Sequence, residues 1–206
     1  MLTDYLLVTF SDVVPTADAE FNDWYNETHL PEFVACPGFR AAARYRSDDG
    51  QPTYLALYEA ERADALTSDE VKRAWGWGPM WPHIRNAHGR LYRRTFTLSN
   101  EGEPESALPP VVLAATSDVT DEFVDGFNHW YNEIHLPEIL ACPGFVSASR
   151  YECVSGEPQF LALYHVAGPE VLTTPEMGRA HGWGPAQPHL RSFHGRLYTR
   201  IHRVPT

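Results

Sequence analysis

The spacing of apolar positions changes from one segment of the chain to the next. Residues 5–10 form a continuous apolar run rich in β-formers, which predicts a strand. Residues 16–34 carry apolar side chains at close to helical spacing, which predicts a helix. Pro31 is expected to end or kink this helix near Leu30, because proline has no amide hydrogen and its ring crowds the preceding turn.

The rest of the first half completes a βαββαβ order. Strands are predicted at residues 39–46, 53–60 and 88–98, and a second helix at residues 63–74. A loop rich in Trp, Gly and Pro, WGWGPMWPHIRNA, precedes the last strand. This order is that of the ferredoxin-like split βαβ fold, in which helices cover one face of a four-stranded antiparallel sheet.

The second half of the chain repeats the first. FNDWYNETHLPEFVACPGF returns as FNHWYNEIHLPEILACPGF, at an offset of 127 − 21 = 106 residues. We therefore predict a first ferredoxin-like repeat at residues 1–98, a polar linker at 99–109 and a second repeat at 110–206. One face of each sheet lacks helices, so the two sheets are expected to pack face to face around a shared interior, as an α+β barrel within one chain.

The strings WYNETHLPE and WYNEIHLPE, each followed by a PGF turn, resemble the dimeric α+β barrel superfamily. The resemblance covers both halves and is closest to EthD-like members, which include fungal pigment dehydratases. Polyketide cyclases and small cofactor-free monooxygenases are more distant relatives. Most such proteins are dimers of single domains, so the tandem fusion implies that one chain does the work of a homodimer. Two such fused chains could also associate as a homodimer, and the sequence leaves this alternative open.

Composition narrows the range of partners. A formal net charge of −11 disfavours binding to nucleic acid, since phosphate backbones would repel the protein. The apolar runs are too short to cross a bilayer, so no membrane association is expected. The N-terminal sequence does not resemble a signal peptide, and the three cysteines form no CxxC motif. These features favour the cytoplasm.

Histidine in the WYNE(T/I)HLPE string is the first candidate for chemistry. On a helix, Tyr25 and Asn26 lie four and three residues before His29, so all three share a face. A histidine held by Asn or by Glu32 beside aromatic rings can act as a general acid or base. The alternative is that His29 caps the end of the helix at Pro31. The predicted catalytic residues are the pairs His29 and His135, Tyr25 and Tyr131, and Asn26 and Asn132.

The WGWGP loop and the last strand form a second candidate group. Trp77 offers a flat wall for an aromatic ligand, and two Gly and two Pro predict a bent, rigid loop. His88, Arg90 and Tyr92 alternate along one face of the strand and could form a polar floor. The predicted substrate-binding residues are Trp77, Trp183, His88, His194, Arg90, Arg196, Tyr92 and Tyr198. The alternative is that the loop closes the barrel end and the arginines pair with carboxylates.

The leading hypothesis is a cofactor-independent acid–base enzyme of the dehydratase, cyclase, isomerase or lyase type. Its substrate would be a small hydrophobic molecule, aromatic or polyketide-like. No metal motif such as HExxH occurs, although haem-binding relatives of the barrel keep a metal or haem as an alternative. A cofactor-free monooxygenase and a non-catalytic binding protein are two further hypotheses. The two halves differ at several positions, such as Trp75 against His181, without indicating which half is active.

Overall fold

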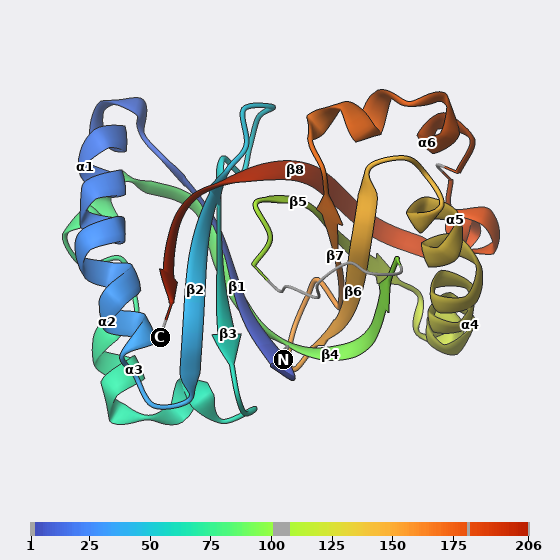
Figure 1. Cartoon of the computed structure of the whole chain (residues 1–206). Helices are drawn as coiled ribbons and strands as arrows, with labels where there is room; N and C mark the ends of the chain where they lie inside the picture. The colour runs from blue at the N-terminus through green and yellow to red at the C-terminus, as the bar shows by residue number, and fades with distance from the viewer. Residues whose placement is uncertain (1–2, 101–107, 181, 206) are drawn as a thin grey trace. The chain divides into compact units, whose positions relative to one another are not determined.

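A computed structural model describes residues 3–100, 108–180 and 182–205. The first repeat comprises β1 (Tyr5–Val13), α1 (Asp18–Trp24), α2 (Leu30–Val34), β2 (Phe39–Arg46), β3 (Tyr54–Ala60), α3 (Asp69–Ala74) and β4 (Ile84–Ser99) (Figure 1). The second comprises β5 (Val111–Val119), α4 (Val124–Trp130), α5 (Leu136–Leu140), β6 (Phe145–Cys153), β7 (Phe160–Val166), α6 (Pro175–Ala180) and β8 (Leu190–Pro205). The predicted βαββαβ order is thus confirmed in both repeats.

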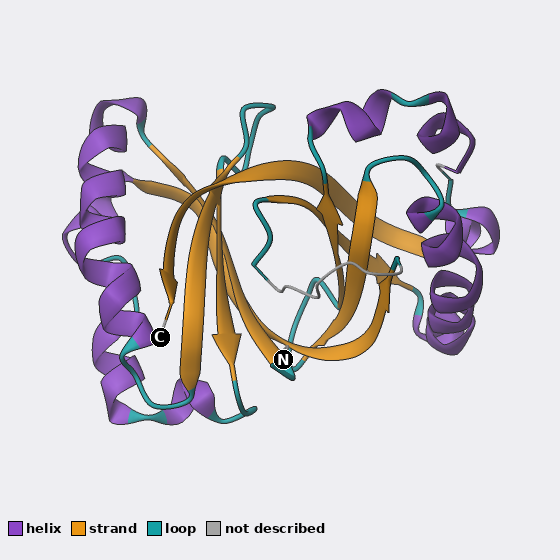
Figure 2. Cartoon of the chain, in the orientation of Figure 1, coloured by secondary structure: helices purple, strands orange, loops and turns teal. Residues whose placement is uncertain are grey.

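The predicted fold class is confirmed as well. The hydrogen-bonding order of the strands, β1-β3-β2-β8-β5-β7-β6-β4, closes on itself and defines an eight-stranded barrel. The paired registers of β1 with β3 and β4, and of β5 with β7, are antiparallel. The helices lie on one side of the strands in each repeat (Figure 2). The fold is therefore the mixed α+β arrangement that the sequence predicts.

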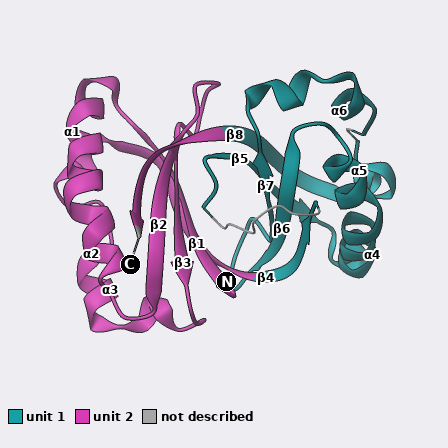
Figure 3. Ribbon diagram, viewed as in Figure 1, with its two compact units in different colours: residues 1, 94–197 teal, residues 2–93, 198–206 magenta. Residues whose placement is uncertain are grey.

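The chain divides into two compact units that do not end where the repeats end (Figure 3). The first-repeat unit contains residues 2–93 and 198–206, and the second-repeat unit contains residue 1 and residues 94–197. In the first-repeat unit, β4 pairs with β1, while the final segment of β8 pairs with β2. Each unit therefore includes part of the other repeat's last strand. Most of the predicted linker, residues 101–107, lies outside the described residues.

The first helix does not end at Leu30, so of the two expected effects of Pro31 the ending of the helix is wrong. The segment runs through α1, a π-helical turn η2 (Tyr25–His29) and α2 without leaving helical geometry. Pro31 lies in the first turn of α2, and the amide of Leu30 bonds back to the carbonyl of Tyr25 across the wider π turn. The hydrogen-bonding register thus changes just before the residue that lacks an amide, so the helix can continue.

The core of each unit lies between its helices and its sheet. Phe21, Leu30 and Phe33 point from the helices onto the sheet and are at most 2% exposed. Each such side chain contributes roughly 1.5–3 kcal/mol on burial. Phe127 and Leu136 have the same role in the second-repeat unit. The three cysteines are free thiols, and no helix of the described part is long and apolar enough to span a membrane.

Candidate active site

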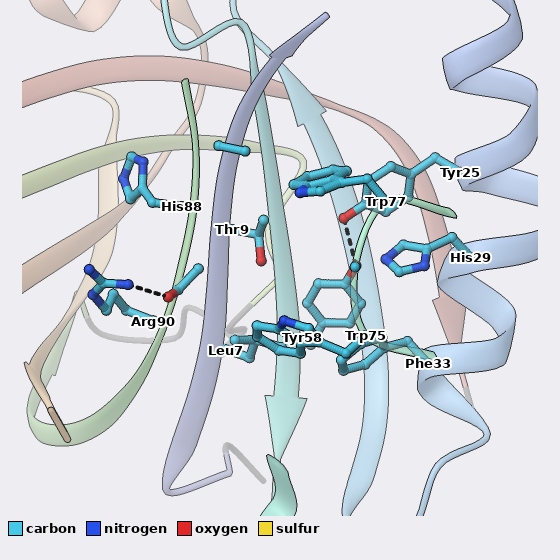
Figure 4. A pocket seen from close by; sticks show the side chains of 13 residues that line it. Leu7, Thr9, Tyr25, His29, Phe33, Tyr58, Trp75, Trp77, His88 and Arg90 are labelled. Atoms are coloured by element: carbon cyan, nitrogen blue, oxygen red, sulfur yellow. Dashed lines mark hydrogen bonds between the residues drawn. The ribbon is translucent and has the colours of Figure 1, made fainter. Parts of the chain in front are cut away.

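A cavity of about 380 Å³ lies inside the first-repeat unit, on the helix-covered face of its sheet (Figure 4). Its walls come from three parts of the unit. The helical segment contributes Tyr25, His29 and Phe33, the sheet contributes Leu7, Thr9 and Tyr58, and the loop before β4 contributes Trp75 and Trp77. The sequence predicts a cavity between two sheets, whereas this one lies between the helices and the sheet of a single unit.

The loop that carries Trp77 has the bent backbone predicted for it. Gly78 has a φ of +43°, which favours glycine, and a Cβ at this position would lie 3.3 Å from Cζ2 of Trp24. The loop can therefore pass close to α1, and the Trp77 ring lies 6.1 Å from the Tyr25 ring. Trp77 and its counterpart Trp183 both line cavities.

His29 lies at the end of the π turn and is enclosed by aromatic rings. It stacks on Trp24, with ring centroids 4.8 Å apart, and meets the edge of Tyr25 at the same distance. Burial, with the positive charge of Arg44 as a second cause, lowers the pKa of His29 to about 4. His29 is therefore neutral near pH 7. Among the described residues it has no hydrogen-bond partner, so a ligand in the cavity can use its ring nitrogens.

Tyr25 and Tyr58 form a buried pair of hydroxyl groups beside His29. Their oxygens lie 2.7 Å apart, one presented by the π turn and the other by β3. Burial raises the pKa of Tyr25, and it raises that of Tyr58 well above the usual value. Both phenols thus remain protonated near pH 7. One proton of the pair is used within the hydrogen bond, and the other is free to be donated to a ligand oxygen.

Arg44 lies beneath this pair and is only 1% exposed. Its guanidinium carbon is 4.2 Å from the centroid of the Tyr25 ring, and Nη1 donates a 2.7 Å hydrogen bond to Oδ1 of Asn26. Within the described residues it makes no ion pair with a carboxylate, and Nη2 has no partner. A buried cation without an anion is costly to hold, so it favours negative charge that develops nearby.

Two details of the predicted site are wrong. Asn26 hydrogen-bonds with Arg44 and so does not orient His29. The alternative role of His29 as a cap also fails, because the helix continues beyond it into α2. Sequence reasoning missed Arg44 and Tyr58. The signal was present, since Arg150 and Tyr164 repeat them at the same offset of 106, but each stands in a strand where packing alone explains a large side chain.

His88, Arg90 and Tyr92 do not share the face of the sheet that His29 faces. His88 stacks on Phe10, with centroids 5.1 Å apart, and Tyr92 is 1% exposed. Figure 4 shows the side chains of His88 and Arg90 on the far side of β1 from His29. Gly89, the residue between them, pairs with Thr9 and faces the cavity. His88 and Arg90 are nevertheless among the residues that line the cavity, whereas Tyr92 is not.

The second-repeat unit keeps the same central groups around a smaller space. Its hydroxyl pair, Tyr131 and Tyr164, is 2.6 Å apart, and Arg150 lies 4.3 Å from the Tyr131 ring centroid. His135 stacks on Trp130 at 4.7 Å, and Nη1 of Arg150 donates to Asn132 at 2.8 Å. The cavity beside them is only about 70 Å³. The unit therefore has the polar groups but no room for a ligand of ordinary size.

The remaining predicted residues lie along β8, which both units share. His194 and Arg196 are partly buried in the second-repeat unit. Tyr198 belongs to the first-repeat unit, where it is fully buried and its hydroxyl donates to the carbonyl oxygen of Pro52. Tyr198 thus belongs to a different unit from Trp183, with which the sequence pattern grouped it. Across the described residues, no cluster of three or more His, Cys, Asp or Glu is placed to hold a metal ion.

Comparison with solved structures identifies the fold. An anthrone oxidase-like protein superposes with a TM-score of 0.76 at 11% identity, over 98% of this chain and 92% of that one. A mutant chlorite dismutase from Candidatus Nitrospira defluvii gives 0.63 at 12%, over 96% and 90%. A proposed monooxygenase from Lactobacillus acidophilus NCFM gives 0.61 at 10%, over 98% and 95%. These neighbours share the dimeric α+β barrel fold. No family model and no curated protein matches the chain.

Proposed function

We propose that the first-repeat unit is an acid–base enzyme for a small, planar, aromatic or polyketide-like molecule that carries an acidic C–H or O–H group. One observation supports this proposal most strongly. A neutral histidine and a hydroxyl pair line the same cavity, and beside them lies an arginine that has no counter-ion within the part of the chain that the structure describes. The second-repeat unit has counterparts of these groups, but the cavity beside them is only about 70 Å³, so the proposal assigns the reaction to the first-repeat unit.

The roles follow from the chemistry of each group. The ring of the substrate packs against Trp77, and a carbonyl or phenol oxygen accepts a hydrogen bond from the Tyr25–Tyr58 pair. His29, neutral near pH 7, accepts the proton from the neighbouring carbon or oxygen. Arg44 stabilises the resulting enolate or phenolate through Tyr25. The new anion also favours the protonated histidine beside it, which offsets the low pKa of His29 in the empty site.

A second candidate is cofactor-free oxygenation, favoured by the fold of the anthrone oxidase-like neighbour. It begins with the same proton transfer. For an anthrone, loss of a proton from the methylene carbon gives a carbanion that is oxidised by dioxygen through a hydroperoxide. Loss of water then gives the quinone, so that anthrone and O₂ yield anthraquinone and H₂O. The protein's own residues supply only the base and the oxyanion contacts.

Anthrone in D₂O tests both candidates with one compound. Without oxygen, the enzyme should exchange the methylene protons for deuterium faster than buffer does. In air, the second candidate adds oxygen uptake that is stoichiometric with quinone. His29→Asn should slow exchange by about 10²–10⁴-fold, the usual contribution of a general base. His135→Asn is the matched control and should retain wild-type rates.

The outcomes separate the hypotheses for this compound class. Equal rates in His29→Asn and the wild type would refute the base role. Tight binding of anthrone that is recovered without deuterium or oxidation would favour a non-catalytic binding protein. The proposal requires no metal or haem, and metal analysis with an absorbance spectrum of the active protein tests that part. The EthD-like relationship, the cytoplasmic location and a further homodimer stay predictions, the last of them testable by the mass of the protein in solution.

A further inference from the structure

The two cavities differ most clearly at one pair of equivalent positions. Ala87 lines the cavity of about 380 Å³, and Phe193, 106 residues later, lines the cavity of about 70 Å³. Except for Met177, every residue that lines the smaller cavity is the counterpart of one that lines the larger. The Phe193 ring meets Trp183 nearly edge to face, with centroids 4.7 Å apart and an interplanar angle of 71°. Phe193, a residue that is 46% exposed, thus places an aromatic ring at the wall of the smaller cavity where the larger cavity has only the methyl group of Ala87.

Gly195, two residues after Phe193 on β8, makes room for that ring. A Cβ on Gly195 would lie 2.6 Å from Cζ of Phe193, closer than such atoms approach, so the ring requires glycine there. Gly89 is the counterpart in the first-repeat unit. The nearest groups to a Cβ on Gly89 are Oγ1 of Thr9 at 3.3 Å and Cη2 of Trp75 at 3.7 Å. Among the described residues, none comes as close to Gly89 as the Phe193 ring comes to Gly195.

We infer that Phe193 marks the place where the first-repeat cavity holds an aromatic ring of its ligand. The ligand ring would lie near Gly89, beside Trp75 and against Trp77, in the space that Ala87 leaves open. There it would be beside the hydroxyl pair, which suits a ring that carries an oxygen. The ligand class is therefore a planar phenol or aryl ketone. This inference rests on the proposed site and is independent of the reaction assigned to it.

Trp75 adds a second aromatic side chain to the cavity wall that Trp77 forms. It lines the cavity, lies close to Gly89 and is 51% exposed, so it offers a second aromatic wall toward solvent. Two indole rings accommodate a fused bicyclic ligand better than a single ring. We therefore choose 2-naphthol as the probe, because it combines a fused ring system with one hydroxyl and has no methylene group to oxidise.

Calorimetric titration with 2-naphthol tests the inference. The wild type should bind one molecule per chain. Ala87→Phe should weaken binding at least tenfold, because the new ring occupies the same space. Phe193→Ala should raise the stoichiometry to two, since the second-repeat unit keeps Trp183 and its own hydroxyl pair. Wild-type affinity in Ala87→Phe, or a single site in Phe193→Ala, would overturn the inference.

A second variant covers the case in which Ala87→Phe does not fold. Gly89→Ala adds one methyl group to the floor of the cavity and should weaken 2-naphthol binding, with circular dichroism confirming the fold. Unchanged affinity in Gly89→Ala would also overturn the inference. The reaction can fail separately. If 2-naphthol binding responds as expected but no variant or wild type exchanges anthrone protons, the proposed function is wrong and the binding position stands.

Discussion

The hydroxyl oxygens of Tyr25 and Tyr58 lie 2.7 Å apart, although 33 residues separate them in the chain. Tyr131 and Tyr164 repeat this contact at 2.6 Å with the same separation. In each unit, one oxygen comes from a π turn and the other from the third strand of the repeat. π turns are frequent at functional sites, because the extra residue redirects the side chains that follow. Here the turn directs a tyrosine and a histidine onto the sheet.

Removal of one hydroxyl group of the pair should reduce turnover without unfolding the protein. Tyr25→Phe deletes the hydroxyl group of the tyrosine whose ring packs against Arg44, and the loss of an oxyanion donor costs about 10²–10³-fold in kcat. Stability should fall by only about 1 kcal/mol. Anthrone exchange rates measure the first effect and urea denaturation the second. Tyr131→Phe, with the same stability cost, should keep full activity, and equal losses in both variants would contradict the assignment to the first-repeat unit.

The low pKa of His29 should make stability depend on pH. The pKa is about 4 in the folded protein and about 6.5 in the unfolded chain, so between these values the unfolded chain binds the proton more readily. The free energy of unfolding should therefore decrease as the pH falls from about 6.5 to about 4, by roughly 3 kcal/mol from this residue. His29→Asn should lose this part of the pH dependence. Parallel pH curves for wild type and variant would show that the histidine titrates normally.

Removal of the buried cation should raise the pKa of His29. The charge of Arg44 is the second cause of the depressed value, after burial, so Arg44→Met should move the pKa of His29 upward from about 4 while burial still holds it below 6.5. Histidine ring resonances followed by NMR against pH measure this shift. Arg150→Met is the control and should leave the pKa of His29 unchanged. A fall in the pKa of His29 in Arg44→Met would contradict the electrostatic account.

The end of β8, residues 198–205, pairs with β2 of the first-repeat unit, so the stability of that unit should depend on this C-terminal segment. Tyr198 is fully buried there, contacts Phe10 and donates a hydrogen bond to the carbonyl of Pro52. Tyr198→Ala should therefore destabilise the protein by about 3–5 kcal/mol, as large-to-small aromatic substitutions generally do. Native-state hydrogen exchange should show faster exchange in β1, β2 and β3. Unaltered protection in these strands would indicate that the segment is not needed by the unit.

The fold could be predicted from the sequence because its signals are local or repeated. Strand β2, for example, matches its predicted residues 39–46 at both ends. The pairing of the end of β8 with β2 could not be predicted. The sequence shows that the last strand is long, but it does not show which strand of the other repeat that extra length pairs with. The path of the helix through Pro31 was also missed, because a π turn leaves no signal in the spacing of apolar residues.

The candidate site was predicted in part. Tyr25, His29 and Trp77 were expected beside a ligand and do line one cavity. Arg44 was missed because a single charge in a strand usually faces solvent, and only the three-dimensional structure shows that this one is buried. His88 and Arg90 also line this cavity, whereas Tyr92 does not. Strand alternation could not show this difference, because it gives two faces without showing which of them the helices cover.

The most direct test of the account is a crystal structure of the wild-type protein with bound 2-naphthol. The account predicts one molecule in the first-repeat cavity, with its rings against Trp77 and its oxygen within hydrogen-bond distance of Tyr25 or Tyr58. A crystal saturated with the probe in which this cavity is empty, while 2-naphthol is bound elsewhere on the chain, would contradict the account.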